Sequence, residues 1–268
     1  MAEANRPLAG KVALITGASR GIGRDVAVAL AEAGADIVVA ARSETVTDPR
    51  LPGTIHTVAK EVEARGARAL PVKLDVGKDE DIEAAVQKTL DTFGRIDILM
   101  NNAAILVPGT TRSVQPRHID LIYRINLRAP IMLIRAAIDP MAKGGGGHII
   151  NVSSRGAVFP GPGPYSEDQV QRARGAFYGM VKAGLERYSQ GLAMELQPDG
   201  ISVNVLSPQG RIATPGSKFA ANSRENPDLE FEEAVDMGKA TVWLCRQDPR
   251  RFTGHILFDQ EVVREQGL

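Results

Sequence analysis

Several features that define other protein classes are scarce in this sequence. It contains one cysteine, Cys245, so no internal disulfide can form, and the apolar run around it favours a buried filler over a reactive thiol. Its four histidines are scattered without the spacing of metal ligands. We therefore expect neither a disulfide framework nor a metal centre.

Net charge and long apolar runs are also missing. The 32 basic and 32 acidic residues cancel, which argues against the clustered basic surface of a nucleic-acid-binding protein. No apolar run approaches the roughly 20 residues of a membrane span, and residues 1–8 contain no apolar core of the signal-peptide type. The expectation is a cytoplasmic protein with no nucleic-acid or membrane partner.

The chain instead alternates short apolar strands with amphipathic helices. A first strand at Val12–Ile15 runs into the glycine-rich segment Thr16–Gly23, a helix follows to Gly34, and Asp36–Ala41 is the next strand. Such a βαβ unit joins parallel strands. Further helices are predicted at Thr54–Gly66, Asp79–Phe93, Ser113–Met141 with an interruption at Pro130, Ala173–Leu196 and Glu232–Cys245. Further strands are predicted at Ala67–Asp75, Ile96–Met100, His148–Val152, Ile201–Leu206 and Gly254–Phe258.

A length of 268 residues is ordinary for one large α/β core, and no linker, repeat or composition break divides the chain. We predict a single domain over residues 1–268. Its fold class is α/β, with a doubly wound parallel sheet of about seven strands and helices on both faces.

Tyr178 and Lys182 stand four residues apart in a predicted helix, so they share one face. An ammonium group beside a phenol favours the phenolate and lowers the tyrosine pKa from its usual value near 10. Such a tyrosine can exchange a proton with an alcohol or carbonyl oxygen near neutral pH. The same spacing also occurs on ordinary solvated helices, so the surrounding motifs must decide between the two.

The segment Thr16–Gly23 places three glycines at a strand-to-helix junction, at Gly17, Gly21 and Gly23. Glycines there permit a tight turn, the close approach of a pyrophosphate, and close packing of the helix on the sheet. The free N–H groups and the positive end of the following helix then face the phosphates. The segment therefore predicts a dinucleotide-binding turn.

The order of these parts resembles the short-chain dehydrogenase/reductase family. Thr16–Gly23 matches its opening motif T-G-x-x-x-G-x-G. The later markers stand in the family's order at Asp75, Asn101–Ala104, Asn126, Ser154, Tyr178 and Lys182. The resemblance extends from Gly10 to about Asp259 and implies a Rossmann-type fold and hydride transfer between a nicotinamide coenzyme and an alcohol or carbonyl.

Within the family, the chain is most similar to the hydroxysteroid-dehydrogenase-like branch. The shared segments are the loop Leu51–Thr57 and the ending Phe252–Asp259. Some members of that branch continue into a sterol-carrier domain, which these 268 residues do not contain. The branch name does not establish a steroid substrate.

The resemblance implies four catalytic residues. Ser154 would hold the substrate oxygen, and Tyr178 would be the acid in reduction and the base in oxidation. Lys182 would lower the pKa of the tyrosine and bind the nicotinamide ribose. Asn126 would order a water that connects Lys182 to solvent.

Ser153 and Tyr165 are the competitors for these roles. Ser154 is preferred because it stands fourth after the Ile149–Ile150 pair, as the family's serine usually does. Tyr165 is disfavoured because Gln169 stands where its lysine should be. Ser154 and Tyr178 are 24 positions apart, further than is usual in the family. The extra residues, Pro160–Tyr165 followed by Arg172 and Arg174, predict a stiff loop beside the site.

The coenzyme residues are also taken from the resemblance. They are Gly17, Ser19, Arg20, Gly21, Ile22, Gly23, Arg42, Asp75, Val76, Asn102, Ala103, Tyr178, Lys182 and Thr214, the last placed after an apparent insertion at Pro208–Gly210. The end of the second strand carries Arg42 where NAD-binding turns place a carboxylate. Arg20 and Arg42 could clamp a 2′-phosphate, which favours NADP(H) over NAD(H) unless Arg42 is only a solvated surface residue.

The predicted substrate is a secondary alcohol or a ketone, with lipid-like compounds included. Its pocket would be walled by Ile105–Pro108, Phe159–Tyr165 and Arg211–Asn226. The alternatives are a catalytically silent sensor or scaffold that binds nucleotide, and an NAD-linked alcohol dehydrogenase. By resemblance, the apolar helices over residues 119–138 and 183–192 pair across a two-fold axis, and the charged tail Glu261–Leu268 lies near subunit contacts, giving a homodimer or homotetramer.

Overall fold

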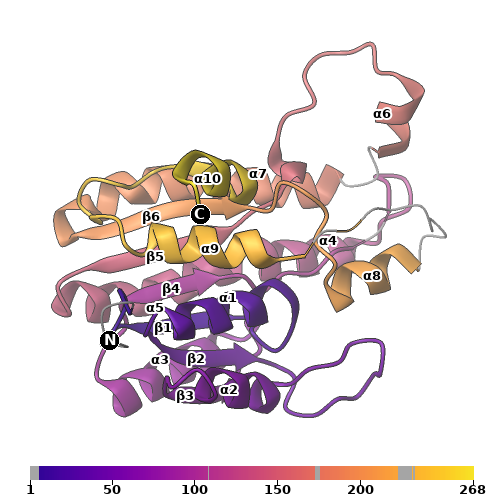
Figure 1. Cartoon of the computed structure of the whole chain (residues 1–268). Coiled ribbons are helices and arrows are strands. Elements are labelled where there is room, and N and C mark those ends of the chain that lie inside the picture. The colour runs from indigo at the N-terminus through magenta and orange to yellow at the C-terminus, as the bar shows by residue number, and fades with distance from the viewer. Residues whose placement is uncertain (1–5, 108, 173–175, 223–230, 232) are drawn as a thin grey trace.

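The computed structural model describes residues 6–107, 109–172, 176–222, 231 and 233–268 (Figure 1). Its centre is a parallel sheet with the strand order β3-β2-β1-β4-β5-β6-β7. The strands are β1 (Val12–Thr16), β2 (Asp36–Ala41), β3 (Ala69–Lys73), β4 (Ile98–Asn101), β5 (Gly147–Val152), β6 (Ile201–Ser207) and β7 (Ile256–Phe258). The predicted seven-stranded doubly wound sheet is confirmed. Because the order reverses between β1 and β4, a crevice forms there at the carboxyl ends of the strands.

β1 shows why short apolar runs specify such a sheet. All five of its residues are buried. Ala13 and Ile15 belong to the core on one face, whereas Val12 and Leu14 belong to the core on the other. A strand buried on both sides needs apolar residues at every position, since successive side chains point in opposite directions.

Within the described residues, helices pack on both faces of the sheet (Figure 1). One face carries α1 (Gly21–Glu32), α2 (Ile55–Glu63) and α9 (Val235–Leu244), and the other carries α3 (Asp79–Phe93), α5 (Ala129–Lys143) and α7 (Ala176–Leu196). The bounds predicted for α3 are confirmed to the residue: acidic residues fill its first turn and Gly94 ends it at φ +75°. The starts predicted for two helices, Ala173 and Glu232, lie outside the described residues.

The predicted break at Pro130 is wrong. The chain passes from α4 (Pro116–Tyr123) through a π-helical segment, Arg124–Arg128, directly into α5. Pro130 lies in the first turn of α5 and has no N–H to donate to the carbonyl of Asn126. The wider π turn ahead of it accommodates the missing hydrogen bond without ending the helix.

Three further helices were absent from the sequence prediction: α6 (Glu167–Arg172), α8 (Pro215–Asn222) and α10 (Asp259–Gln266). α6 lies within the extra residues between Ser154 and Tyr178, which project from the body of the protein as an arm (Figure 1). The prediction of a simple stiff loop is therefore wrong for this part of the segment. Arg174 and the side chain of Arg172 lie outside what the structure describes.

Candidate active site

A cleft of about 740 Å³ opens at the carboxyl ends of the strands. It is lined by the first turn, by residues that follow β2, β3, β4 and β5, and by the start of α7. The predicted site residues in its wall are Gly17, Ser19, Arg20, Gly21, Ile22, Arg42, Asp75, Val76, Asn102, Ala103, Ser154, Tyr178, Lys182 and Thr214. Gly23 and Asn126 do not line it, and their positions are described below.

The first turn is held by the side chain of Asn102. Its Nδ2 donates to the carbonyl oxygens of Thr16, at 2.8 Å, and Gly17, at 3.3 Å. Gly17 and Gly21 have φ values of +68° and +55°, which glycine adopts without strain. A Cβ on Gly23 would lie 2.6 Å from both Asn102 Nδ2 and the Gly17 oxygen. Gly23 therefore allows α1 to pack against the turn from behind the cleft.

Thr214 approaches the same turn from the opposite wall. A Cβ on Gly21 would lie 2.8 Å from Cγ2 of Thr214, so the two residues are in close contact. The Thr214 hydroxyl accepts from the backbone N–H of Ser217 at 2.9 Å, a cap of α8. The structure thus places Thr214 in the cleft despite the insertion that precedes it.

Arg20 and Arg42 form a cationic end of the cleft. Arg20 Nη2 donates to Ser43 Oγ at 2.6 Å and to the Gly53 carbonyl at 3.2 Å. Its buried Nε has no hydrogen-bond partner among the described residues. Burial, and then the positive charge of Arg42, lower the pKa of Arg20. Two close cations and an unused buried donor suit an anionic ligand group, so the residues fit a phosphate.

The predicted catalytic side chains meet where β5 ends and α7 begins. Ser154 and Tyr178 are hydrogen-bonded to each other. Lys182 Nζ donates to the carbonyl of Val152 at 2.7 Å and lies 5.7 Å from the centre of the Tyr178 ring. The geometry separates the two serines: Ser153 donates to Glu186 Oε1 at 2.6 Å instead. Tyr165, the other competitor, donates to the carbonyl of Gly161 within the arm and does not line the cleft.

Gly179 explains how the start of α7 comes so close to the strand. A Cβ on Gly179 would lie 2.5 Å from the carbonyl oxygen of Gly156. Gly156 belongs to the 3-10 turn Arg155–Ala157, whose N-cap is Ser154. Any side chain at Gly179 would push Tyr178 away from Ser154.

The expected lowering of the Tyr178 pKa is wrong. Burial raises the pKa of Tyr178 to about 12, and the hydrogen bond with Ser154 offsets only part of that effect. Burial also lowers the pKa of Lys182 to about 8, against the opposing charge of Glu186. The ammonium of Lys182 is bonded to the Val152 carbonyl, and desolvation of the buried phenol is the largest cause of the Tyr178 pKa shift.

Asn126 is fully buried in the π-helical segment. Its Oδ1 accepts from the backbone N–H of Ile105 at 2.9 Å, and its Nδ2 donates to the Ile105 carbonyl at 2.8 Å. The side chain therefore fixes Ile105, which lines the cleft. A water link from Asn126 to Lys182 stays a prediction.

Only some of the residues predicted to wall the substrate pocket line the cleft. Ile105 and Thr214 line the cleft, whereas Phe159 lies on the arm with 85% of its surface exposed. Pro108 and residues 223–226 lie outside the described ranges.

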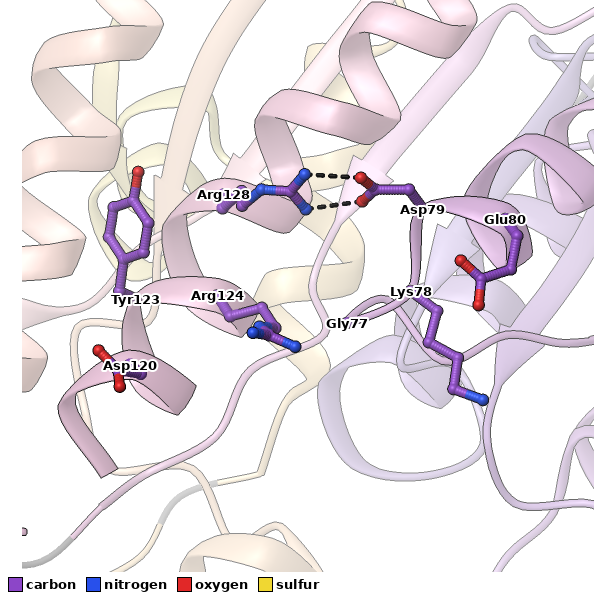
Figure 2. Close-up of a pocket in the computed structure, with 8 residues that line it drawn as sticks. All are labelled: Gly77, Lys78, Asp79, Glu80, Asp120, Tyr123, Arg124 and Arg128. Atoms are coloured by element: carbon purple, nitrogen blue, oxygen red, sulfur yellow. Dashed lines mark hydrogen bonds and ion pairs between the residues drawn. The ribbon is translucent and has the colours of Figure 1, made fainter. Parts of the chain in front are cut away.

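A second hollow of about 640 Å³ adjoins the cleft (Figure 2). Arg128 donates two hydrogen bonds of 2.6 Å to Asp79 across it. Lys78 and Arg124 line both the hollow and the cleft. Sequence patterns do not single out Lys78 or Arg124, because a charged residue beside a helix start or on a helix usually indicates only solvent exposure.

Comparison with known proteins agrees with this geometry. The sequence model of the family described as short chain dehydrogenase matches residues 11–225. The chain belongs to this family. Proteins of this family are oxidoreductases that use a nicotinamide dinucleotide, NAD or NADP.

Curated relatives support the predicted branch. Human hydroxysteroid dehydrogenase-like protein 2 is 35% identical over 262 residues, covering 97% of this chain and 59% of the human protein. The Danio rerio protein of the same name is 33% identical over 261 residues, covering 97% of this chain and 60% of the relative. The chain thus spans less than two thirds of the length of these relatives.

Solved structures share the fold. A short chain dehydrogenase from Mycobacterium thermoresistibile is 32% identical with a TM-score of 0.81, covering 97% of this chain and 89% of the other. A dehydrogenase/reductase from Sinorhizobium meliloti 1021 is 31% identical with a TM-score of 0.75, covering 95% of each chain. No helix within the described ranges is long and apolar enough to cross a membrane. Those ranges also contain no group of three or more potential metal ligands.

Proposed function

We propose that the chain is an NADP(H)-dependent oxidoreductase that interconverts a secondary alcohol and a ketone, with lipid-like substrates included. The observation that carries the coenzyme choice is the pair of neighbouring cations, Arg20 and Arg42, at one end of the cleft. The unused Nε of Arg20 and the hydroxyl of Ser43 add donors there. A 2′-phosphate would accept from these groups, whereas a ribose 2′-hydroxyl would find no carboxylate to accept from it at Arg42.

The first turn and Asn102 would hold the dinucleotide, and the nicotinamide supplies or accepts a hydride when it is bound. Tyr178, with a pKa of about 12, is protonated at neutral pH and can donate its proton to the oxygen of a ketone. Ser154 would hydrogen-bond the same oxygen and orient it. In the oxidative direction, the proton would pass from the alcohol to Tyr178.

Coenzyme titration tests the choice of NADP(H). The fluorescence of NADPH and NADH would be followed with the wild type, with Arg42→Ala and with the control Arg251→Ala, which removes a highly exposed arginine outside the cleft. A charged hydrogen bond contributes roughly 1.5–3 kcal/mol, so Arg42→Ala should weaken NADPH binding about 10- to 100-fold. NADH binding and the control should change little.

Three other outcomes would contradict parts of the proposal. Equal affinity for the two coenzymes would favour an NAD-linked alcohol dehydrogenase. Binding of coenzyme without turnover across a panel of ketones and secondary alcohols would favour a silent sensor or scaffold. Binding of neither coenzyme would refute the coenzyme-dependent function. Where turnover is found, Tyr178→Phe should abolish it while coenzyme still binds.

We also propose a homodimer or homotetramer. α7 carries Met180 and Met194 with 54% and 78% of their surfaces exposed, so apolar side chains on this helix are available to a second copy of the chain. Sedimentation velocity should give twice or four times the chain mass of 28.7 kDa, and Met194→Asp should shift the distribution towards monomer. A monomer at micromolar concentration would refute this assembly.

A further inference from the structure

Three side chains on one face of α7 contact three consecutive residues at the end of β5. Tyr178 bonds Ser154, Lys182 bonds the carbonyl of Val152, and Glu186 bonds Ser153. The three α7 side chains stand four residues apart and therefore share one helix face. Tyr178 and Lys182 are predicted catalytic residues, whereas no role is assigned to Glu186. Glu186 makes the third of these contacts between α7 and the end of β5.

The hydrogen bond between Ser153 and Glu186 is short, and its donor, Ser153, is buried. Ser153 Oγ donates to Glu186 Oε1 at 2.6 Å, and only 2% of the Ser153 surface is exposed. The backbone N–H of Ser153 is bonded to Leu206 on β6. Ser154 is the next residue and contacts Tyr178 on the same helix face, so the Glu186–Ser153 hydrogen bond holds the segment that carries Ser154 against α7. Loss of the acceptor would leave a buried hydroxyl without its partner.

The negative charge of Glu186 also acts on Lys182. Lys182 is 2% exposed, and its ammonium donates a hydrogen bond to an uncharged carbonyl, that of Val152. Glu186 favours the charged form of Lys182, and Lys182 in turn lowers the pKa of Glu186, which burial raises. Other charged or titratable groups on the elements that contact α7 are Arg117, His118, Asp120, Arg124, Arg128, His148, Arg155 and Asp199. None of these is a cause of the pKa shift of Lys182, and Tyr178 on α7 itself is uncharged at neutral pH.

We propose that Glu186 is a positioning residue of the active site, which orients the residues that follow β5 through its hydrogen bond with Ser153 and places a carboxylate one helical turn from buried Lys182. The catalytic meaning of this role rests on the proposed function. The two physical actions do not require bound coenzyme, so they can be measured separately from turnover.

The test uses variants that separate charge from hydrogen bonding. Glu186→Gln removes the charge and keeps an oxygen that can accept from Ser153. Ser153→Ala removes the hydrogen bond and keeps the charge. Glu195→Gln is the control, since it removes an exposed carboxylate from the same helix. The readout is the protonation midpoint of Lys182 in coenzyme-free protein, followed by NMR of ¹⁵N-labelled lysine and assigned with Lys182→Arg.

The wild-type midpoint should lie at about 8. Glu186→Gln should move it to lower pH, and a shift of about one unit would leave about a tenth of Lys182 cationic at pH 8 instead of half. Ser153→Ala should lower the melting temperature with little change in the midpoint, and Glu195→Gln should change neither. If the enzyme turns over, the pH profile of kcat should move with the midpoint in Glu186→Gln.

An unchanged Lys182 midpoint in Glu186→Gln would overturn the proposal. If that variant fails to fold, Glu186→Asp replaces it: a retained midpoint with a lowered melting temperature supports the electrostatic role, and a midpoint that falls despite the retained charge refutes it. Because the midpoint is read without coenzyme, failure of this inference remains distinct from failure of coenzyme binding, which would refute the proposed function.

Discussion

Gly23→Ala should damage both the stability of the fold and the binding of coenzyme. The added methyl would lie 2.6 Å from Asn102 Nδ2 and from the Gly17 oxygen, and 3.0 Å from the Ala18 Cα. Ordinary contact begins at 3.4 Å, so α1 and the turn must separate by several tenths of an ångström. Two of the three obstructing atoms are backbone, which cannot move alone.

The expected cost follows from this crowding. Overpacking of a dense region costs about 1–3 kcal/mol, and weakening the two Asn102 hydrogen bonds adds about 1 kcal/mol. We expect the free energy of unfolding to fall by about 2–4 kcal/mol. NADPH affinity should fall about tenfold or more, because the N–H groups at the start of α1 are displaced from the phosphates by a similar distance.

Urea denaturation and NADPH titration would measure the two effects. Gly191→Ala is the matched control: Gly191 lies inside α7, and the nearest atom to an added Cβ is the flexible end of Arg187 at 3.4 Å. Alanine in a helix interior should stabilise that variant by about 0.5–1 kcal/mol without affecting coenzyme. Wild-type stability together with wild-type NADPH affinity in Gly23→Ala would refute this account of the turn.

Two further predictions concern buried titratable groups. Burial lowers the pKa of His148 from 6.5 to about 4, so its contribution to stability is complete above pH 6.5 and is lost as the pH falls towards 4. The loss should reach about 3 kcal/mol in urea unfolding, and His148→Gln should show a correspondingly weaker pH dependence; equal dependence in the two proteins would contradict this. Burial also raises the pKa of the Cys245 thiol, so folded protein at pH 8 should not react with a disulfide reagent until it is denatured. Rapid labelling of the native protein would contradict the buried position.

The sequence predicts those parts of the fold whose local signals agree with the tertiary structure. The first four residues of β1 are apolar because both faces of the strand are buried, and α3 begins with acidic residues and ends at Gly94. Pro130 was misleading because its local effect is absorbed by a π turn. The short helices α6 and α10 have few apolar residues, so periodicity gives little signal for them.

In the candidate site, too, the sequence predicts local relations between residues but not the effects of tertiary contacts. Helical spacing correctly places Tyr178 and Lys182 on one face of α7, because that relation is local. Their pKa directions depend on burial and on the carbonyl of Val152, which is distant in the sequence. The role of Glu186 depends on the same long-range contact with β5. A pattern of residues predicts which groups meet, but not the solvation that sets their protonation.

The long separation between Ser154 and Tyr178 does not stretch the site. Gly156, two residues after Ser154, packs directly against Gly179, the residue after Tyr178. This backbone contact brings the two side chains together, while residues 158–172 extend from the body of the protein as the projecting arm (Figure 1). The entropy of closing a loop rises only slowly with its length, so extra residues there cost little. The geometry of the site is therefore set by the two glycines, and the length of the intervening chain can vary without altering the contact between Ser154 and Tyr178.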